Sequence, residues 1–505
     1  MAECKNPAQL SKSKFVAGVQ CLKRLYWLVH EPKLKPEPDE TTQAIFDQGH
    51  EVEEAARKAF PGGVVVKGEH WEVQSALRQT AQLTADPNVS AIFEAAFLAD
   101  RILVRVDILQ RPRGGKWRLI EVKSTTGVKE EAHHLEDVAI QKHVLQRAGV
   151  PLSSTSLMHL NRKYVYDGVR LVPDELFTIA DISRQLSRIE ENLPRLLKQQ
   201  RAVLAQTKPP TVEPGDQCTR PYICEFYDLC NKAVPDDYVG NLPGIRRQRV
   251  QQLSAMGVTK MRDIPADFPL SSRQWRACQC VTTNKPYFGP RLRRELAQLK
   301  YPVFFMDFET FNPALPRFAK MRPFDHIPFQ WSVHVQQKPD APLEHHEFLS
   351  DDGRDPRREF VESLLKVLED GRERGSIVVY NRSFEAGRMA DLAGWLPEYD
   401  RRIGRIQSRL WDLLPVLREQ VYHPSFCGSF SMKDVLPALV PGMSYEDMEV
   451  AEGGQAGLAY NALVREALSV SERNRLRKAL LAYCKQDSLG MVRVLKKLED
   501  HALQD

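Results

Sequence analysis

The sequence lacks any long uninterrupted run of apolar residues. No stretch approaches the roughly 18 apolar residues that a membrane-spanning helix needs. The opening residues, MAECKNPAQLSKSKF, contain no apolar core of the kind found in secretory signal peptides. With 42% hydrophobic and 27% charged residues, the composition is that of a globular protein. We therefore expect a cytoplasmic protein without a membrane partner.

Cysteine is also scarce, with nine residues in a chain of 505. The number is odd and most of the cysteines are scattered, which argues against a disulfide framework. Only Cys218, Cys224 and Cys230 are regularly spaced, in a segment rich in turn residues. The chain length itself predicts two or three domains rather than one core.

Positive charge is unevenly distributed along the chain. Residues 241–300 contain twelve Lys and Arg against three Asp and Glu, a local balance of +9. Because the whole chain carries +5, the remaining residues together carry about −4. A basic segment in an otherwise slightly acidic chain favours a polyanionic partner. The alternative is a charged face that contacts only solvent.

Two acids and a lysine are brought together by predicted strands in the first half of the chain. Residues two apart on a strand share a face, so Glu121 and Lys123 in LIEVKS point the same way. Asp107 ends the preceding strand, across a hairpin turn containing Gly114-Gly115. Two carboxylates suit Mg²⁺ or Mn²⁺, because both ions favour oxygen ligands. The lysine can orient a metal-bound water molecule or neutralise negative charge that develops at a phosphate.

At these residues the chain resembles the PD-(D/E)xK nucleases, and more closely their RecB-type branch, which includes the CRISPR adaptation nuclease. That branch has an upstream histidine, which His50 matches as a metal ligand, and a helical glutamine, which Gln141 matches. The tyrosine that follows this glutamine in the branch is replaced here by Leu145. Glu94 is either an auxiliary acid or an ordinary strand residue; we favour the second interpretation.

The same resemblance implies an iron–sulfur cluster bound by four cysteines. One cysteine would precede the nuclease core, here Cys21, and three would follow it, here Cys218, Cys224 and Cys230. Four thiolates suit a 4Fe–4S cluster, which would join the first helix to the end of the domain. The spacing C-x5-C-x5-C departs from the tighter spacing of the best-known members. Tetrahedral zinc and free structural cysteines are the alternatives.

The basic segment resembles a helix-hairpin-helix around Pro243-Gly244. Such motifs present backbone N–H groups to a phosphate, as helix N-termini do. Arg246, Arg247 and Arg249 place further positive charge beside the turn. The alternative is a structural helical hairpin that binds nothing.

A second group of acids is predicted in the last 200 residues. Asp307 and Glu309 share one face of the buried strand in VFFMDFET, where paired carboxylates are costly unless they bind something. Tyr483 and Asp487 are four residues apart in a predicted helix and so share a face. Between these motifs a strand runs into a helix that carries Glu385.

These motifs resemble the DnaQ-like (DEDD) exonucleases, in the family's order and over roughly residues 300–500. The resemblance implies an RNase H-like fold in which Asp307, Glu309, Asp487 and Glu385 hold two divalent ions and Tyr483 orients the attacking water. The family has Asp where Glu385 stands, and Asp391 is an alternative. A degenerate scaffold without activity is the competing interpretation.

The sequence thus predicts a multidomain α/β protein. We expect a PD-(D/E)xK nuclease domain with its iron–sulfur site in residues 1–235, a small helix-hairpin-helix-like linker in 236–299 and an RNase H-like exonuclease domain in 300–505. This layout resembles an uncharacterised bacterial family defined as a domain of unknown function. The expected function is a DNA nuclease of defence, repair or recombination, acting on single strands or free ends. The alternatives are a nuclease with one inactive, substrate-binding domain, an RNA-processing nuclease and a cluster-bearing scaffold without activity.

Overall fold

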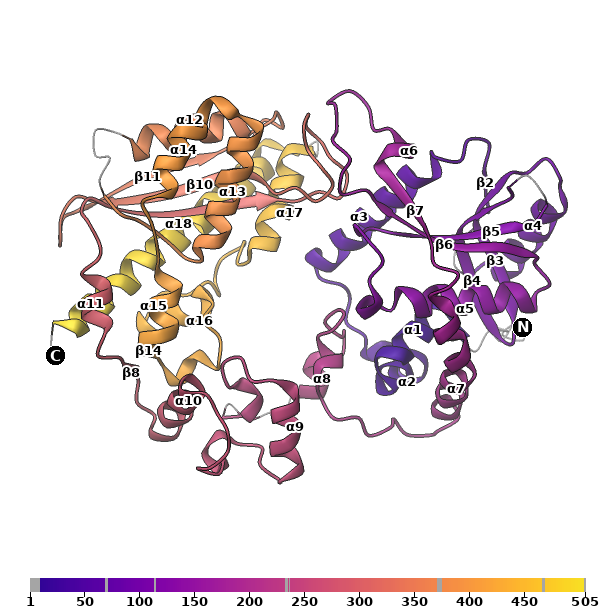
Figure 1. Ribbon diagram of the computed structural model, residues 1–505, viewed down its shortest axis with the longest axis horizontal. Coiled ribbons are helices and arrows are strands. Elements are labelled where there is room, and N and C mark those ends of the chain that lie inside the picture. The colour runs from indigo at the N-terminus through magenta and orange to yellow at the C-terminus, as the bar shows by residue number, and fades with distance from the viewer. Residues whose placement is uncertain are drawn as a thin grey trace. The chain divides into compact units, whose positions relative to one another are not determined.

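The chain forms two compact units. The computed structural model describes residues 10–68, 71–112, 115–231, 235, 237–369, 375–465 and 468–503. The first unit contains Met1–Ala233 together with Pro313–Asp325, and the second contains Val234–Asn312 and His326–Asp505. The basic segment, predicted as a separate linker, therefore lies within the second unit. Figure 1 shows the helices and strands of both units.

The first unit is built on a mixed sheet of seven strands in the order β2-β3-β4-β5-β6-β7, with β1 paired to β4. The strands are β1 (Leu10–Ser11), β2 (Val64–Val65), β3 (Ala91–Ala99), β4 (Ile102–Gln110), β5 (Trp117–Lys123), β6 (Leu152–Leu160) and β7 (Phe177–Asp181). The antiparallel pairing of β4 with β5 confirms the predicted hairpin, although Gly114 lies outside the described residues. The β5 and β6 strands are parallel, and helix α5 connects them.

Eight α-helices surround this sheet among the residues described. They are α1 (Lys12–Gln20), α2 (Leu22–His30), α3 (Glu40–Arg57), α4 (Val73–Ala85), α5 (His134–Arg147), α6 (Pro173–Leu176), α7 (Leu186–Leu204) and α8 (Tyr227–Asn231). Helix α5 buries Val138, Ile140 and Val144 in the same apolar core as the sheet. It ends before Gly149, whose φ of +79° is the left-handed conformation that favours glycine.

The sequence pattern over residues 175–207 predicts one long helix, and this prediction is wrong in its first third. Phe177–Asp181 forms strand β7, and helix α7 begins only at Leu186. The segment FTIAD pairs antiparallel with β6 and buries Phe177, so its tertiary pairing outweighs the helical pattern that follows it.

The second unit is built on a five-stranded sheet in the order β11-β10-β9-β12-β13. The strands are β9 (Val303–Phe311), β10 (Ile327–Gln336), β11 (Leu343–Leu349), β12 (Ile377–Val379) and β13 (Leu410–Asp412). Strand β10 runs antiparallel to both of its neighbours, whereas β12 and β13 run parallel to β9. A separate pair is formed by β8 (Tyr287–Phe288) and β14 (Val421–Tyr422).

Alternation along β9 sends its side chains to two different layers. Phe304, Met306 and Phe308 pack into a core with residues of α12, α13 and α14. Asp307 and Glu309 therefore face the opposite layer, where α17 and α18 pack against β9. In Figure 1, α12 and α14 lie on one side of this sheet and α18 on the other.

The helices described in this unit include one of 33 residues, α18. They are α9 (Arg247–Ala255), α10 (Ser272–Thr283), α11 (Leu292–Leu296), α12 (Arg357–Leu368), α13 (Arg382–Trp395), α14 (Asp400–Gln407), α15 (Leu413–Gln420), α16 (Met432–Leu439), α17 (Gly453–Arg465) and α18 (Val470–Ala502). A capping box between Ser469 and Glu472 starts the long helix α18. In the part of the chain that the structure describes, no helix has both the length and the apolar character needed to cross a bilayer.

The turn at Pro243-Gly244 is followed by helix α9, whereas the residues described between 237 and 242 contain no helix of comparable length. Gly244 has a φ of +63°, and Gly257, which follows α9, has a φ of +74°. The element before the turn is a single 3-10 turn, Val239–Asn241. The described part of the motif is thus a turn that leads into α9.

Two candidate metal sites and a four-cysteine group

The predicted residues of the first acid group lie together at β4 and β5. Glu121 is 1% exposed, and its Oε1 accepts a hydrogen bond of 2.7 Å from the Lys123 ammonium. Asp107 is also buried, and its Oδ2 accepts a 2.7 Å hydrogen bond from the backbone N–H of Val122. The strand pairing thus places both carboxylates and the lysine in one cluster, as the sequence predicts.

Helix α5 completes this cluster with an amide and a third acid. Gln141 Nε2 donates to Glu121 Oε2 at 2.8 Å and to Asp137 Oδ1 at 3.1 Å. Lys123 Nζ lies 2.6 Å from Asp137 Oδ2. The sequence analysis missed Asp137, although it stands one helical turn before Gln141 and therefore on the same face.

Lys12 is a second cation that the sequence analysis missed. Its Nζ lies 2.9 Å from Glu121 Oε1 and 3.4 Å from Asp107 Oδ1, so that it links both acids. Burial alone would raise the pKa of Glu121, but Lys12 and Lys123 hold that pKa below its usual value. Burial and the nearby charge of Glu121 raise the pKa of Asp107 well above its usual value.

His50 lies close enough to Glu53, a neighbour of this cluster, to lower the pKa of that carboxyl. His50 is exposed on α3, and among the described residues no hydrogen bond or ion pair joins it to Asp107 or Glu121. The α3 residue that interacts electrostatically with Glu121 is Glu53, whose pKa is raised by burial and by neighbouring acids. Glu94 is paired with an arginine of α3 rather than with this cluster. A ligand role for His50 remains a prediction.

The donor set of this cluster fits a hard divalent ion. Asp107 and Glu121 offer carboxylate oxygens, which Mg²⁺ and Mn²⁺ prefer. The Oε1 atom of Gln141 is buried without a hydrogen-bond partner among the described residues. This oxygen could therefore accept a hydrogen bond from a water molecule of a bound ion. These residues would hold the ion, with Lys123 beside it.

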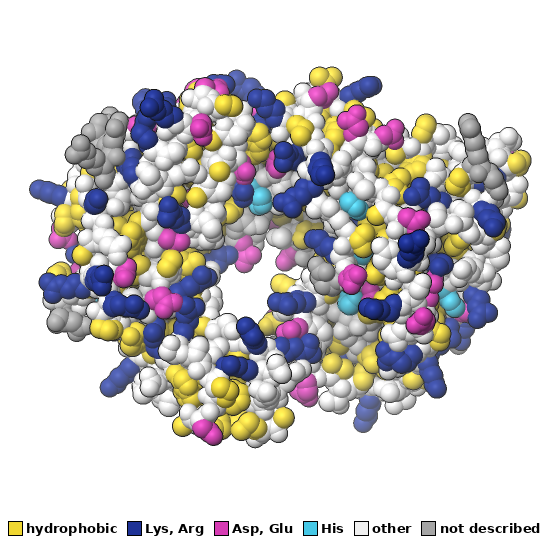
Figure 2. Space-filling model, in the orientation of Figure 1, with side chains coloured by type: hydrophobic (Ala, Val, Ile, Leu, Met, Phe, Trp, Pro, Cys, Tyr) yellow, Lys and Arg dark blue, Asp and Glu magenta, His cyan; other side chains and the backbone are white. Residues whose placement is uncertain are grey.

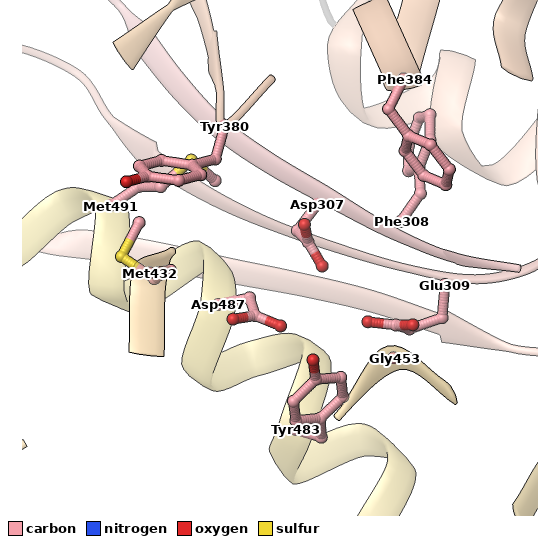
Figure 3. Close-up of a pocket in the computed structure, with 10 residues that line it drawn as sticks. All are labelled: Asp307, Phe308, Glu309, Tyr380, Phe384, Met432, Gly453, Tyr483, Asp487 and Met491. Carbon is pink, nitrogen blue, oxygen red and sulfur yellow. The ribbon is translucent and has the colours of Figure 1, made fainter. Parts of the chain in front are cut away.

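The second acid group lines a cavity of about 240 Å³ in the second unit. Figure 3 shows the carboxylates of Asp307, Glu309 and Asp487 turned toward a common space, with the hydroxyl of Tyr483 at its edge. The first two acids come from β9 and the other two residues from α18. Four of the predicted site residues are therefore brought together.

Burial makes these carboxyls hard to ionise in the absence of a cation. It raises the pKa of Asp307 and of Glu309 well above their usual values, and the neighbouring acids add to this rise. Burial also raises the pKa of Asp487 to about 6, against the effect of hydrogen bonds from Tyr445 and Tyr483. Tyr445, which donates to Asp487 Oδ1 at 2.5 Å, was not identified from the sequence. A bound divalent ion would favour the ionised carboxylates.

A cysteine adjoins these acids as well. Cys484 is fully buried, and its thiol lies 3.6 Å from Asp307 Oδ2. Among the residues that the structure describes, Asp307, Glu309 and Cys484 are a group of three whose ligand atoms all lie within 4.8 Å of one another. The donor set that surrounds the cavity therefore fits a metal ion.

Glu385 lies near the acids but does not line the cavity. It is 2% exposed, its Oε2 has no partner among the described residues, and its charge raises the pKa of Asp307. Burial raises the pKa of Glu385 itself to about 8. The alternative, Asp391, is paired with Arg388 at 2.7 Å and is not among the residues that line the cavity.

We expect Glu385→Gln to stabilise the metal-free protein at pH 8 and to change its stability little at pH 5. An unfolded chain releases this proton near pH 4.5, whereas folded Glu385 holds it up to about pH 8. The folded state binds the extra proton between these values, so the free energy of unfolding falls as the pH rises through this window. Glutamine does not titrate and removes this contribution, which should raise the melting temperature at pH 8 by several degrees, at about 2–4 °C per kcal/mol.

Thermal melting in EDTA from pH 5 to 8.5 measures this difference. Asp391→Asn, in the same helix and at the surface, is the matched control. Parallel melting curves for the parent and Glu385→Gln across this range would show that the carboxyl of Glu385 is not held neutral.

The four predicted cluster cysteines also meet in one place. Besides burial, Cys21 raises the pKa of Cys224, and Cys218 and Cys21 raise the pKa of Cys230. Gln20, the last residue of α1, donates from Nε2 to the backbone oxygen of Gln217 at 2.7 Å. The start and the end of the first unit are thus joined at this group.

The arginines beside the Pro243-Gly244 turn differ in their surroundings. Arg246 and Arg247 are exposed. Arg249 is half-buried, and its guanidinium donates to the backbone oxygen of Pro269. The first two are therefore more accessible to solvent than the third.

Comparison with known proteins finds relatives of uncharacterised function. "Uncharacterized protein UU173" of Ureaplasma parvum serovar 3 is 24% identical over 227 residues, which cover 41% of this chain and 33% of the relative. The "Uncharacterized protein MG366 homolog" of Mycoplasma pneumoniae is also 24% identical, over 42% of this chain and 34% of the relative. The matched region thus spans about a third of each relative's length.

One solved structure and one family model also match parts of the chain. The structure titled "Crystal structure of SSO0001" is 16% identical and covers 46% of this chain and 90% of its own, with a TM-score of 0.23. That TM-score is too low to assign a fold. Residues 304–431, which include Asp307, Glu309 and Glu385, match the family described as "Domain of unknown function (DUF2779)".

Proposed function

We propose that this protein is a divalent-metal-dependent nuclease with two active sites, which hydrolyses phosphodiester bonds of DNA in genome defence, repair or recombination. The observation that carries the proposal is the convergence of Asp307, Glu309 and Asp487 on one cavity with Tyr483 at its edge. Buried acids of like charge raise the free energy of the folded state unless they bind a cation. The cluster at Asp107 and Glu121 supports a second site of the same kind.

The C-terminal site would hold the ions through its three carboxylates. Bound Mg²⁺ or Mn²⁺ supplies charge stabilisation at the phosphate and lowers the pKa of a coordinated water. Tyr483 would orient the attacking water through a hydrogen bond that its hydroxyl donates. The half-buried ring of Phe384 also lines the cavity, where it offers a face for stacking of a terminal base. The resemblance to DnaQ-like enzymes implies attack at 3′ ends.

The N-terminal site would work with a lysine in place of the tyrosine. Asp107 and Glu121 would hold the ion, and Lys123, 2.7 Å from Glu121, would neutralise charge that develops at the phosphate. Gln141 fixes the carboxylate of Glu121 through a hydrogen bond of 2.8 Å. A β-hairpin that carries both acids, followed by a crossover helix that carries the glutamine, supports assignment of the first unit to the PD-(D/E)xK fold.

An RNase H-like fold is our proposal for the second unit. Its support is the mixed five-stranded sheet, whose central strand β9 carries Asp307 and Glu309. The proposal requires that the helix with Tyr483 and Asp487 pack on the face of the sheet that carries Asp307 and Glu309. Helix α18, which contains both residues, packs against β9 and β10.

A 4Fe–4S cluster is our proposal for the four cysteines, with zinc as the alternative. Tetrahedral zinc, with Zn–S bonds of about 2.3 Å, needs all four sulfurs within roughly 4 Å of one another. The cysteines interact electrostatically, yet no three of these described residues have sulfurs within 4.8 Å of one another. The wider spacing favours a multi-iron cluster, in which each thiolate binds a different iron.

The basic segment supports a nucleic-acid partner. On the face shown in Figure 2, Lys and Arg side chains are interspersed with acidic ones over both units. The excess of +9 in residues 241–300 is therefore a property of that segment and not of the whole face. Positive side chains near a turn that leads into a helix suit contacts to phosphates rather than to bases.

Replacing Arg246 and Arg247 with Ala should therefore weaken binding to all DNA sequences alike. Each lost phosphate contact should lower the slope of log affinity against log salt by about 0.9 on duplex DNA. Fluorescence anisotropy at several salt concentrations measures the slope. Arg262→Ala, at a residue paired with Asp237, is the control within the same segment. An unchanged slope in the double variant would mean that these arginines contact only solvent.

One observation favours a second candidate function, in which the first unit binds substrate without cleaving it. The ammonium of Lys12 lies between Asp107 and Glu121, where the proposed metal would be. Cleavage assays of the parent and of Asp307→Asn on single- and double-stranded DNA and RNA, with Mg²⁺, Mn²⁺ or EDTA, separate these functions, because only the N-terminal site remains in the variant. Failure of the parent to cleave any of them with either metal would overturn the nuclease proposal, and cleavage of RNA alone would replace DNA as the substrate.

A further inference from the structure

Lys12 reaches the N-terminal site from the first turn of α1. Its Nζ lies 2.9 and 3.2 Å from the two carboxylate oxygens of Glu121 and 3.4 Å from Oδ1 of Asp107. Among the residues that the structure describes, it is the side chain that contacts both acids. Its ammonium therefore bridges the carboxylates of Asp107 and Glu121, as a bound cation would.

The charges of the cluster leave little room for a divalent ion next to this ammonium. The Lys12 ammonium contacts Asp107 and Glu121, and the Lys123 ammonium contacts Glu121 and Asp137, so each of these carboxyl groups already has a cationic partner. An ion bound between Asp107 and Glu121 would stand within a few ångströms of the Lys12 ammonium, where two cations repel strongly in a mostly buried site.

The lysine side chain can leave without movement of its helix. Its side chain is 25% exposed, and the four-carbon stem can turn the ammonium toward solvent. The other end of α1 is fixed, because Gln20 donates hydrogen bonds to three backbone oxygens of the 217–222 loop.

We propose that Lys12 occupies the cation position of the N-terminal site and that a divalent ion binds there only by displacing the ammonium. Lys12 thereby sets the metal affinity of this site. The inference rests on the metal site proposed above and adds a residue that controls its occupancy.

Direct Mn²⁺ binding to the full-length protein tests this inference. The C-terminal site is silenced with Asp307→Asn and Asp487→Asn, and free Mn²⁺ is measured by electron paramagnetic resonance during titration. Lys12→Met should bind Mn²⁺ about tenfold or more tightly than the parent, because a competing charge at contact distance is gone. Lys12→Gln is the second neutral variant, in case methionine disturbs folding, and Lys12→Arg should retain weak binding.

Lys14→Met, two residues further along the same helix, is the matched control and should bind as the parent does. If Lys12→Met and Lys12→Gln bind Mn²⁺ no more tightly than the parent, and Asp107→Asn abolishes that binding, the displacement inference is wrong and the metal site stands. If no variant shows Mn²⁺ binding that Asp107→Asn removes, the proposed N-terminal metal site fails, and the inference fails with it.

Discussion

Asp307→Asn and Asp487→Asn should each reduce the release of nucleotides from 3′ ends by a factor on the order of 10³ or more. Both residues are carboxylates that line the cavity of the second unit, and loss of either removes a ligand of the proposed ions. Asp107→Asn and Lys123→Ala should instead abolish a second cleavage pattern, on single-stranded or flapped ends. Folding should survive Asp307→Asn, because one member of a mutually repelling group is neutralised.

Assays with end-labelled single strands, duplexes and flaps distinguish the two activities, with thermal melting beside each measurement. Asp391→Asn is the matched control, since this acid of the same unit is paired with Arg388 outside the cavity. If Asp307→Asn degrades every substrate as well as the parent while Asp107→Asn is inactive, the second unit is a binding scaffold and the two-site proposal fails.

Residues that a short pattern places together could be identified from the sequence. Glu121 and Lys123 are two apart on one strand, and Asp107 is joined to them by a short hairpin, so local geometry alone predicts their proximity. The same holds for Asp307 with Glu309. The strand and helix periods fix these relations before any tertiary contact forms.

Residues that arrive from a distant element could not be identified in this way. Lys12 meets Glu121 across 109 positions of sequence, and no local pattern marks it as different from Lys14. Tyr445, which contacts Asp487 across 42 positions, lies in a segment with no regular periodicity. Such contacts depend on how elements pack, which a single sequence does not reveal.

The division of the chain shows the same limit. Composition set residues 236–299 apart as a basic linker, but this segment packs within the second unit. The reverse holds for Pro313–Asp325, which belongs to the first unit although strands of the second unit flank it. Its anchors include a hydrogen bond from the backbone N–H of Ala314 to the side chain of Gln48, a contact between residues 266 positions apart.

Cys218→Ser should remove the brown colour that we expect of the anaerobically purified protein, together with about four irons per chain. Cys218 is buried beside the other three cysteines of the group. Serine is a poor ligand for iron in such clusters, so one substitution should release the whole cofactor. The proposed cluster would join Cys21 to the loop that begins near Gln217. Gln20, next to Cys21, is hydrogen-bonded to Gln217, 197 positions away in the sequence.

Loss of that link should destabilise the first unit in particular. Closing a loop of this length in the unfolded chain is worth about 5 kcal/mol by analogy with a disulfide, so the unfolding transition of this unit should move down by ten degrees or more. Iron and sulfide analysis, visible absorption and calorimetry measure these effects. Cys427→Ser is the control, because this cysteine is exposed and lies in the second unit. Colourless parent protein with one zinc per chain would end the cluster proposal, since a zinc site accounts for the same four thiolates without iron.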